Sequence, residues 1–170
     1  MKRLIVNADD FGADPYRNAG IARVLAAGAA TSASILANGP AFAHMRHCMA
    51  ELAHRPISWG LHLNLSEGHP ISPGLRYLTG PDGAFLGKAA AAELLGRKRE
   101  GLDLEEEIYR EATAQLAVLT EAGIQVCHLD GHQHIHIFPA VLPVTARLAL
   151  TFAIPWVRIP EEPHPALPNP

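Results

Sequence analysis

The segment Ile57-Ser58-Trp59-Gly60-Leu61-His62-Leu63-Asn64-Leu65 (ISWGLHLNL) alternates large apolar residues with small or polar ones. Successive side chains of a β-strand point to opposite faces of a sheet, so this alternation predicts a strand with two different faces. His62 lies on one face with Gly60 and Asn64. The apolar side chains share the other face: Trp59, Leu61, Leu63 and Leu65.

Strand-like and helix-like segments alternate on both sides of this strand. Asp14 and Pro15 are typical of a helix start, and Gly28 of a helix end. Asp103 with Glu106 predicts a capping box for a later helix. The expected strands are 4–6 (short and buried), 32–37, 57–65, 124–130 and 156–159, and the expected helices are 14–28, 40–54, 103–122 and one after Pro139.

This alternation indicates an α/β fold with a parallel sheet. Ligands of such folds bind at the carboxyl ends of the strands. Five strands make either a small open sheet or the first part of a β/α barrel, which usually takes about 250 residues. With 170 residues, the chain is expected to be a single catalytic domain, 1–170, that is truncated at its C-terminus. The Gly- and Pro-rich stretch 67–87 is expected to be a long functional loop.

Composition limits the classes of protein. Apolar residues make up 48% and charged residues 18%, with a net charge of −3, as in ordinary globular domains. No block of lysine or arginine predicts a nucleic-acid or membrane partner, and no apolar run is long enough to cross a bilayer. A cytoplasmic location is expected, with Cys48 and Cys127 reduced and buried. The sequence does not determine the oligomeric state, and a homodimer stays open.

Two adjacent carboxylates, Asp9 and Asp10, follow the first expected strand. They repel each other, and a cation or a bound proton relieves that repulsion in an enclosed site. Neighbouring side chains at a strand end point in different directions, so one Asp can bind a metal while the other reaches a nearby water. Taken alone, the pair is more typical of a turn or a helix cap.

Four histidines lie between His128 and His136, in the segment HLDGHQHIH. Extended residues four apart are separated by roughly 13 Å, so a straight strand cannot bring all four to one ion. Gly131 predicts a break in the strand. One histidine is expected to bind metal, and the others to have outer-shell, substrate or structural roles. A surface tract that binds metal adventitiously is the alternative.

Asp10, His62 and one of these later histidines are expected to form an Asp-His-His face that leaves open positions on a metal ion. Such an ion lowers the pKa of its water and polarises a carbonyl, and Asp9 would take the water's proton as general base. This equipment suffices to hydrolyse an amide or an ester. His62 alone would be read as an ordinary buried histidine.

Four ordered segments resemble the YdjC-like carbohydrate deacetylases, which include chitooligosaccharide deacetylases: 7–12 (NADDFG), 31–39 (TSASILANG), 60–65 (GLHLNL) and 128–139 (HLDGHQHIHIFP). The resemblance implies a barrel-like β/α fold of the polysaccharide-deacetylase or TIM type. It also implies hydrolysis of the N-acetyl group of an amino sugar.

Carried over position by position, the resemblance implies Asp10, His62 and His132 as metal ligands, Asp9 as the catalytic base and His136 as a substrate contact. It implies one divalent ion, usually magnesium. The imidazole ligands are also suited to zinc, manganese or iron, so the metal is left open. Family members extend well past residue 170, and Arg158 and Glu161 are further candidates to line the pocket.

Three alternatives remain at this point. One is another metal-dependent hydrolase, such as a phosphoesterase or a cyclic amidase. Another is a metal-binding or sensor protein without catalysis. The third is an inactive fragment that keeps the motifs.

Overall fold

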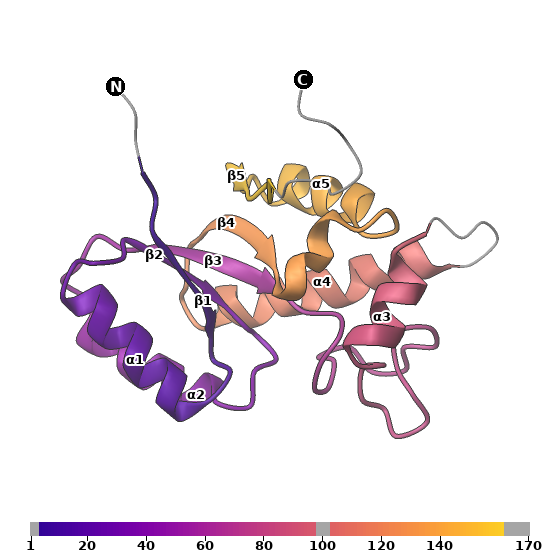
Figure 1. Ribbon diagram of the computed structural model, residues 1–170, viewed down its shortest axis with the longest axis horizontal. Coiled ribbons are helices and arrows are strands. Elements are labelled where there is room, and N and C mark those ends of the chain that lie inside the picture. Colours follow the sequence, from indigo (N-terminus) through magenta and orange to yellow (C-terminus); the bar gives the residue numbers. More distant parts are fainter. Residues whose placement is uncertain (1–3, 98–102, 162–170) are drawn as a thin grey trace.

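The computed structural model describes residues 4–97 and 103–161, and its centre is a five-stranded sheet in which every pair of neighbouring strands is parallel. The strands lie in sequence order, β1-β2-β3-β4-β5 (Figure 1). The elements are β1 (Asn7–Phe11), α1 (Pro15–Ala26), β2 (Ser32–Ile35), α2 (Phe42–Glu51), β3 (Ser58–Leu63), α3 (Lys88–Leu95), α4 (Leu104–Glu121), β4 (Val126–Gly131), the 3-10 helix η1 (His132–Ile137), α5 (Leu142–Thr151) and β5 (Trp156–Val157). The predicted α/β fold with a parallel sheet is confirmed, and sequential order is that of strands in a β/α barrel.

The ISWGLHLNL segment forms β3 at the centre of the sheet, and its two faces are as predicted. Leu61 and Leu63 are fully buried in the core, where they join Ile108 and Leu119 of α4. Trp59 stacks on Phe11 of β1, with ring centroids 6.0 Å apart. The apolar face of β3 therefore anchors the strand, and its other face is left to polar side chains.

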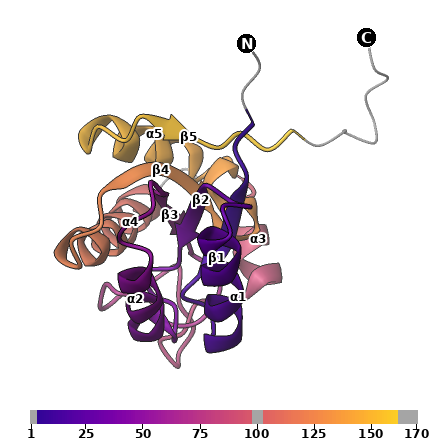
Figure 2. The same ribbon diagram turned by 90° about the vertical axis from the view of Figure 1, so that its left-hand side faces the viewer.

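The helices pack on one core, because buried residues of α1, α2, α4 and α5 (Leu25, Met45, Ile108 and Leu148) belong to a single hydrophobic cluster. In Figure 2, α1 and α2 lie together in the lower part of the molecule, and α5 lies with β5 at the top. Helix α4 packs against β3 and β4, and also against α5, where the Arg147 guanidinium lies 3.7 Å from the centroid of the Tyr109 ring. No helix in residues 4–97 or 103–161 is both long and apolar enough to span a bilayer.

The first strand begins later than predicted. Leu4, Ile5 and Val6 are exposed by 86%, 71% and 44%, so the expected buried strand at 4–6 is wrong. Pairing with β2 starts at Asn7, whose side chain donates to the Ser34 hydroxyl at 2.8 Å and accepts from Ser32. Polar bonds to the neighbouring strand, which a hydrophobicity pattern does not reveal, fix the start of β1.

Two helix starts test the capping predictions. Asp14 caps α1 as predicted, because its carboxylate accepts from the Arg17 N–H at 2.8 Å. The capping box of Asp103 with Glu106 is wrong: Asp103 makes no side-chain cap bond, and Glu106 instead pairs with Arg147 of α5 at 2.6 Å. An ion pair between helices replaces the local cap.

Smaller differences concern α3 and the cysteines. Helix α3, which follows Gly87 without a side-chain cap, was not predicted. Both cysteines are free, as expected, but Cys127 is only half-buried because it lies near the start of β4, outside the core.

The expected long loop, 67–87, lies against α4 and is held there by two buried carboxylates. Glu107 accepts from the N–H groups of Arg76, Tyr77 and Leu78 at 2.7, 2.8 and 2.9 Å. Glu111 accepts from the N–H groups of Ile71 and Ser72 at 3.0 and 2.8 Å. Because five backbone donors converge on two side chains, the loop has a defined conformation without regular secondary structure.

Candidate metal centre

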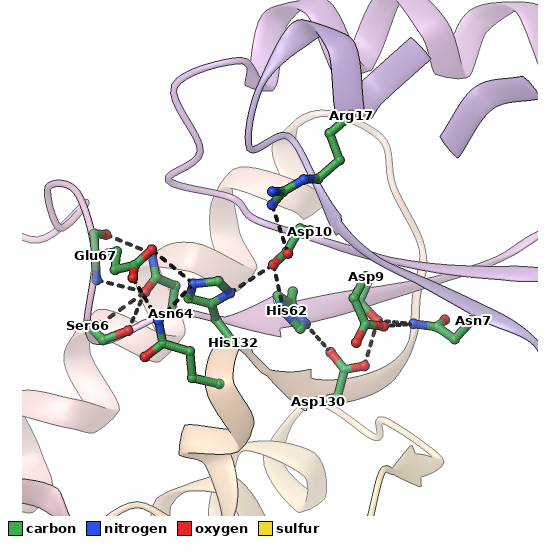
Figure 3. A network of polar contacts seen from close by, with 12 residues as sticks. Asn7, Asp9, Asp10, Arg17, His62, Asn64, Ser66, Glu67, Asp130 and His132 are labelled. Atoms are coloured by element: carbon green, nitrogen blue, oxygen red, sulfur yellow. Dashed lines mark hydrogen bonds and ion pairs between the residues drawn. The ribbon is translucent and has the colours of Figure 1, made fainter. Parts of the chain in front are cut away.

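Asp9 and Asp10 lie on β1, and their side chains diverge. Asp10 has a positive φ of 66°, and the pairing register with β2 shifts between Ala8 and Phe11. A non-glycine residue in this left-handed region costs of order 1–3 kcal/mol, which the surrounding structure must offset. As Figure 3 shows, the strained turn sends Asp10 toward His62 and His132, while Asp9 points to the other side.

Asp10, His62 and His132 come together from β1, β3 and η1. The Oδ1 atom of Asp10 lies 3.2 Å from Nε2 of His62 and 2.8 Å from Nδ1 of His132. One ligand atom from each of the three residues lies within 4.8 Å of the others, which is close enough to hold one ion. These are the three residues that the family resemblance implied as ligands, and the structure brings them into one group.

The break after Gly131 selects His132 from the histidine cluster. Strand β4 ends at Gly131, and η1 begins at once with Gln133 and His134 in left-handed backbone conformations, at φ 55° and 58°. Among the described residues, His132 is the member of the cluster that joins Asp10 and His62. The predicted turn at Gly131 is confirmed.

Asp130 orients His62, a role that was not predicted. The Nδ1–H of His62 donates to Oδ1 of Asp130 at 2.7 Å, which directs Nε2 toward Asp10. Asp130 is fully buried, and its other oxygen accepts from the Ser34 hydroxyl at 2.7 Å and from Arg158 at 2.8 Å. Because Asp130 lies directly opposite His62 in the β3–β4 register, strand pairing was the signal that could have found it.

The histidines of this group bind protons tightly, and their positive charge occupies the place that the charge of a metal ion would take. Burial lowers the pKa of His62, but hydrogen bonds and charge from Asp10 and Asp130 outweigh it and raise that pKa to about 9. The hydrogen bond to Asp10 likewise raises the pKa of His132. Hydrogen bonds from His132 and His62 hold the pKa of the Asp10 carboxyl well below its usual range.

The residues fit a divalent metal ion. Asp10 supplies an oxygen and the histidines supply two nitrogens, one of them with its ring fixed by an outer carboxylate. Two imidazoles with one carboxylate suit zinc, iron or manganese, whereas magnesium prefers oxygen ligands. Binding such an ion would displace the protons that the histidines share with Asp10.

Asp9 is held by an arginine from the other edge of the sheet. Arg158, just after β5, donates to both Asp9 oxygens at 2.7 and 2.8 Å, and Asn7 donates to one of them at 2.6 Å. Burial raises the pKa of Asp9, but these hydrogen bonds and the positive charge of Arg158 lower it overall. The lowered pKa keeps the Asp9 carboxylate ionised. Because the side chain is 40% exposed, solvent can reach it.

Two further histidines of the cluster, His136 and His128, contact groups other than Asp10 and His62. His136 is fully buried and directs Nε2 to the Arg158 carbonyl at 2.8 Å, so its expected contact with a substrate stays a prediction. His128 lies among the hydroxyls of Ser34 and Ser58, at 3.2 and 3.3 Å. Burial, the largest contribution, lowers the pKa of both histidines.

A hollow of about 690 Å³ opens beside Asp9. His128 and Arg158 line it, and so does Trp156, which is 72% exposed. Tyr77 lines a separate hollow of about 520 Å³ against α4, and Glu161, which was expected to line the pocket, is exposed. The hollow of about 690 Å³ is lined by Trp156, Val157 and Arg158 of the β5 region and includes Asp9, but none of Asp10, His62 and His132 lines it.

Comparisons with known proteins identify relatives of this chain. A human protein named carbohydrate deacetylase is 42% identical over 165 residues, which are 94% of this chain and 49% of the relative. A protein of the same name from Brevibacillus brevis is 37% identical over 163 residues, 93% of this chain and 59% of the relative. The chain thus spans about half the length of the curated relatives it matches.

Solved structures show the same fold. A crystal structure described as a candidate cellobiose-phosphate cleavage protein from Enterococcus faecalis V583 superposes with a TM-score of 0.75 at 28% identity. The superposition covers 89% of this chain and 57% of that one. The model of the YdjC-like protein family matches residues 3–169. The chain therefore belongs to the YdjC-like family.

Proposed function

We propose that this chain carries the metal centre of a hydrolase that removes the N-acetyl group from an amino sugar or a short chitooligosaccharide. The observation that carries the proposal is the divergence of Asp9 from Asp10. Asp10 joins His62 and His132, whereas Asp9 belongs to a second possible ligand group with His62 and Asp130, is held by Arg158, and keeps a solvent-reachable carboxylate whose pKa is lowered. The names of the curated relatives support a deacetylase over other hydrolases.

In this mechanism Asp10, His62 and His132 hold the ion. When bound, a divalent ion polarises the amide carbonyl and lowers the pKa of a water molecule. Asp9 accepts the proton of the attacking water at a carboxylate oxygen. Arg158 keeps Asp9 in its anionic form and fixes the plane of its carboxylate through two parallel hydrogen bonds.

The sugar site is proposed to lie at the carboxyl ends of the strands, next to Asp9 and the three candidate ligands, because ligands of parallel α/β folds bind at that edge. The hollow of about 690 Å³ is lined instead by residues at the amino ends of the strands, among them Asn7, Ser32, Ser58 and Trp156, so it is not assigned to the sugar.

The resident ion is proposed to be divalent. The family resemblance implies magnesium, whereas two imidazole ligands favour zinc or manganese. Loading the purified chain with each ion in turn, after removal of metal by a chelator, separates these choices.

The test is acetate release from N,N′-diacetylchitobiose by the chain loaded with magnesium, zinc or manganese, with a phosphorylated disaccharide assayed in parallel. The second substrate is included because the structural neighbour is described as a cellobiose-phosphate cleavage protein. The proposal predicts acetate from the first substrate and no phosphate from the second. Phosphate release without acetate would show a phosphoesterase, and one ion bound without either product would favour a non-catalytic metal protein.

A further inference from the structure

The carboxylate of Glu67 reaches over the candidate metal centre from the loop after β3. Its Oε2 atom lies 3.1 Å from Nε2 of His132, and its Oε1 atom accepts from the Gln133 side-chain amide at 2.7 Å (Figure 3 shows the contact with His132). One side chain therefore contacts two consecutive residues of η1. Neither the roles expected from the sequence nor the mechanism above uses Glu67.

The position of Glu67 is built by a turn around Asn64. The Asn64 side-chain oxygen accepts from the N–H groups of Ser66 and Glu67 at 3.0 and 3.1 Å, and its amide donates to the Glu67 carbonyl at 2.8 Å. Asn64 is itself 4% exposed and bonded through its backbone to Gln115 of α4 at 3.1 and 2.6 Å. The backbone that presents Glu67 is thus tied to the core, although its carboxylate is half exposed.

The two nitrogens of His132 face different carboxylates. Nδ1 faces Asp10 at 2.8 Å, and Nε2 faces Glu67 at 3.1 Å. An imidazole that binds an ion through Nδ1 carries its proton on Nε2, and that proton needs an acceptor. Glu67 is placed to be this acceptor.

His62 shows the same arrangement with its nitrogens exchanged. Its Nε2 faces Asp10, and its Nδ1 donates to the buried Asp130 at 2.7 Å. Both candidate ligand histidines therefore lie between Asp10 on the inside and a second carboxylate on the outside. Outer carboxylates of this kind fix the tautomer and the ring orientation of metal-binding histidines.

The second oxygen of Glu67 stabilises the strained start of η1. Gln133 and His134 have positive φ values of 55° and 58°, a conformation that side-chain-bearing residues rarely adopt in succession. The bond from Gln133 to Glu67 ties this turn to the Asn64 turn, 66 residues apart in sequence. The same carboxylate thus orients the ring of His132 and holds the backbone that carries it.

We propose that Glu67 is a positioning residue of the metal centre, which fixes His132 with Nδ1 directed at the ion. This inference rests on the proposed metal centre and assigns a residue that supports it. Glu67 acts through His132 and does not touch the ion or the reacting atoms.

The test compares Glu67→Ala and Glu67→Gln with the wild type and with Glu121→Ala, an exposed residue at the end of α4 that serves as the control. Zinc affinity is measured by competition with a chromophoric chelator, and the ring ¹⁵N signals of His132 are recorded with and without zinc. We expect Glu67→Ala to weaken zinc binding by about 10- to 100-fold and to change the His132 signals in both states. Glu67→Gln retains an acceptor oxygen and should lose less, and Glu121→Ala should match the wild type.

Two results would overturn the proposal: zinc affinity of Glu67→Ala within twofold of the wild type, or His132 ring signals that do not respond to either Glu67 variant. The metal-free spectra separate this inference from the proposed function. If the wild type binds no divalent ion, the metal hydrolase fails, whereas the Glu67–His132 contact is still judged from the metal-free ring signals.

Discussion

Two regions of the molecule contain buried or half-buried carboxylates, and they differ in what the carboxylates contact. At the candidate metal centre, Asp10 and Asp130 face histidine rings and arginine guanidinium groups. On α4, Glu107 and Glu111 face the backbone N–H groups of the 67–87 loop. A backbone N–H cannot lose its proton or be displaced by a cation, whereas a histidine proton can. Buried carboxylates on α4 are therefore structural anchors, whereas Asp10 faces histidine nitrogens whose protons a metal ion can replace.

The two regions also differ in backbone conformation: it is irregular at the candidate metal centre and regular on α4. Asp10 at the centre has a left-handed conformation, as do Gln133 and His134 in η1. By contrast, Glu107 and Glu111 lie within the regular helix α4. Strain that persists at a cluster of chargeable side chains is typical of functional sites.

Removing a ligand side chain should affect metal binding most. His62→Ala deletes one of three ligands, so zinc affinity should fall by on the order of 1,000-fold, more than the 10- to 100-fold typical of outer-shell changes. Isothermal titration calorimetry measures the affinity. Glu111→Gln is the matched control from the other region, and its zinc affinity should equal that of the wild type. An equal loss of zinc affinity in His62→Ala and Glu111→Gln would refute the proposed difference between the metal centre and the α4 anchors.

Removing a carboxylate that anchors the 67–87 loop should lower the stability of the fold and leave metal binding at the centre unchanged. Glu111→Ala leaves the N–H groups of Ile71 and Ser72 without their acceptor and removes one of the two acceptors of the Gln115 amide, which should cost about 3 kcal/mol of unfolding free energy. Urea denaturation in the presence of a chelator measures this loss. A loss below about 1 kcal/mol would show that the loop does not depend on this anchor.

Two glycines provide a matched test of packing beneath the centre. A Cβ on Gly60 would lie 2.2 Å from Nε2 of His128, so Gly60→Ala should destabilise the fold by about 1–3 kcal/mol through overpacking. Gly20 in α1 has no atom within 4 Å of an added Cβ, so Gly20→Ala should stabilise by up to about 1 kcal/mol through helix propensity. Thermal denaturation of both variants checks the opposite signs. A stable Gly60→Ala protein would mean that His128 moves freely.

The pH dependence of stability should reveal the protonated centre. The folded protein raises the pKa of His62 from its usual 6.5 to about 9, so the stabilisation that this group provides is complete below pH 6.5 and is lost as pH rises through 9. His132, whose pKa is also raised, contributes with the same sign. Chelator-treated protein should therefore be less stable at pH 9 than at pH 6.5 by urea denaturation. His62→Gln should reduce this slope, and an unchanged slope would contradict the assignment.

Much of the fold could be predicted because the local sequence pattern of many segments matches the burial and contacts of those segments in the structure. The alternation around His62 produced a central strand with one apolar face, and Asp14 capped its helix. Predictions from local patterns were wrong where contacts with residues distant in the sequence determine the structure. Leu4 to Val6 look like a buried strand but have no layer over them, and Glu106 forms an ion pair with Arg147 across two helices.

The same limit applies to the site. Placing polar residues at strand ends predicted that Asp10 and His62 would meet one of the later histidines, because parallel strands end at a common edge. Asp130 and Glu67 have no local signal, since their roles depend on strand register and on a turn built by Asn64. The left-handed residues after His132 were likewise invisible, because neither Gln nor His favours that conformation.

The central claim is that adjacent Asp9 and Asp10 divide the work between base and ligand. Its most direct test measures bound zinc and acetate release on the same preparations of wild type and Asp9→Asn. The amide oxygen of Asn still accepts one of the two hydrogen bonds from Arg158, whereas its NH2 group cannot accept the other, so the substitution keeps the size of the side chain and removes the base. We predict one ion per chain in both proteins and at least a ~100-fold loss of acetate release in Asp9→Asn. Loss of the ion together with activity, or turnover close to that of the wild type, would contradict the claim.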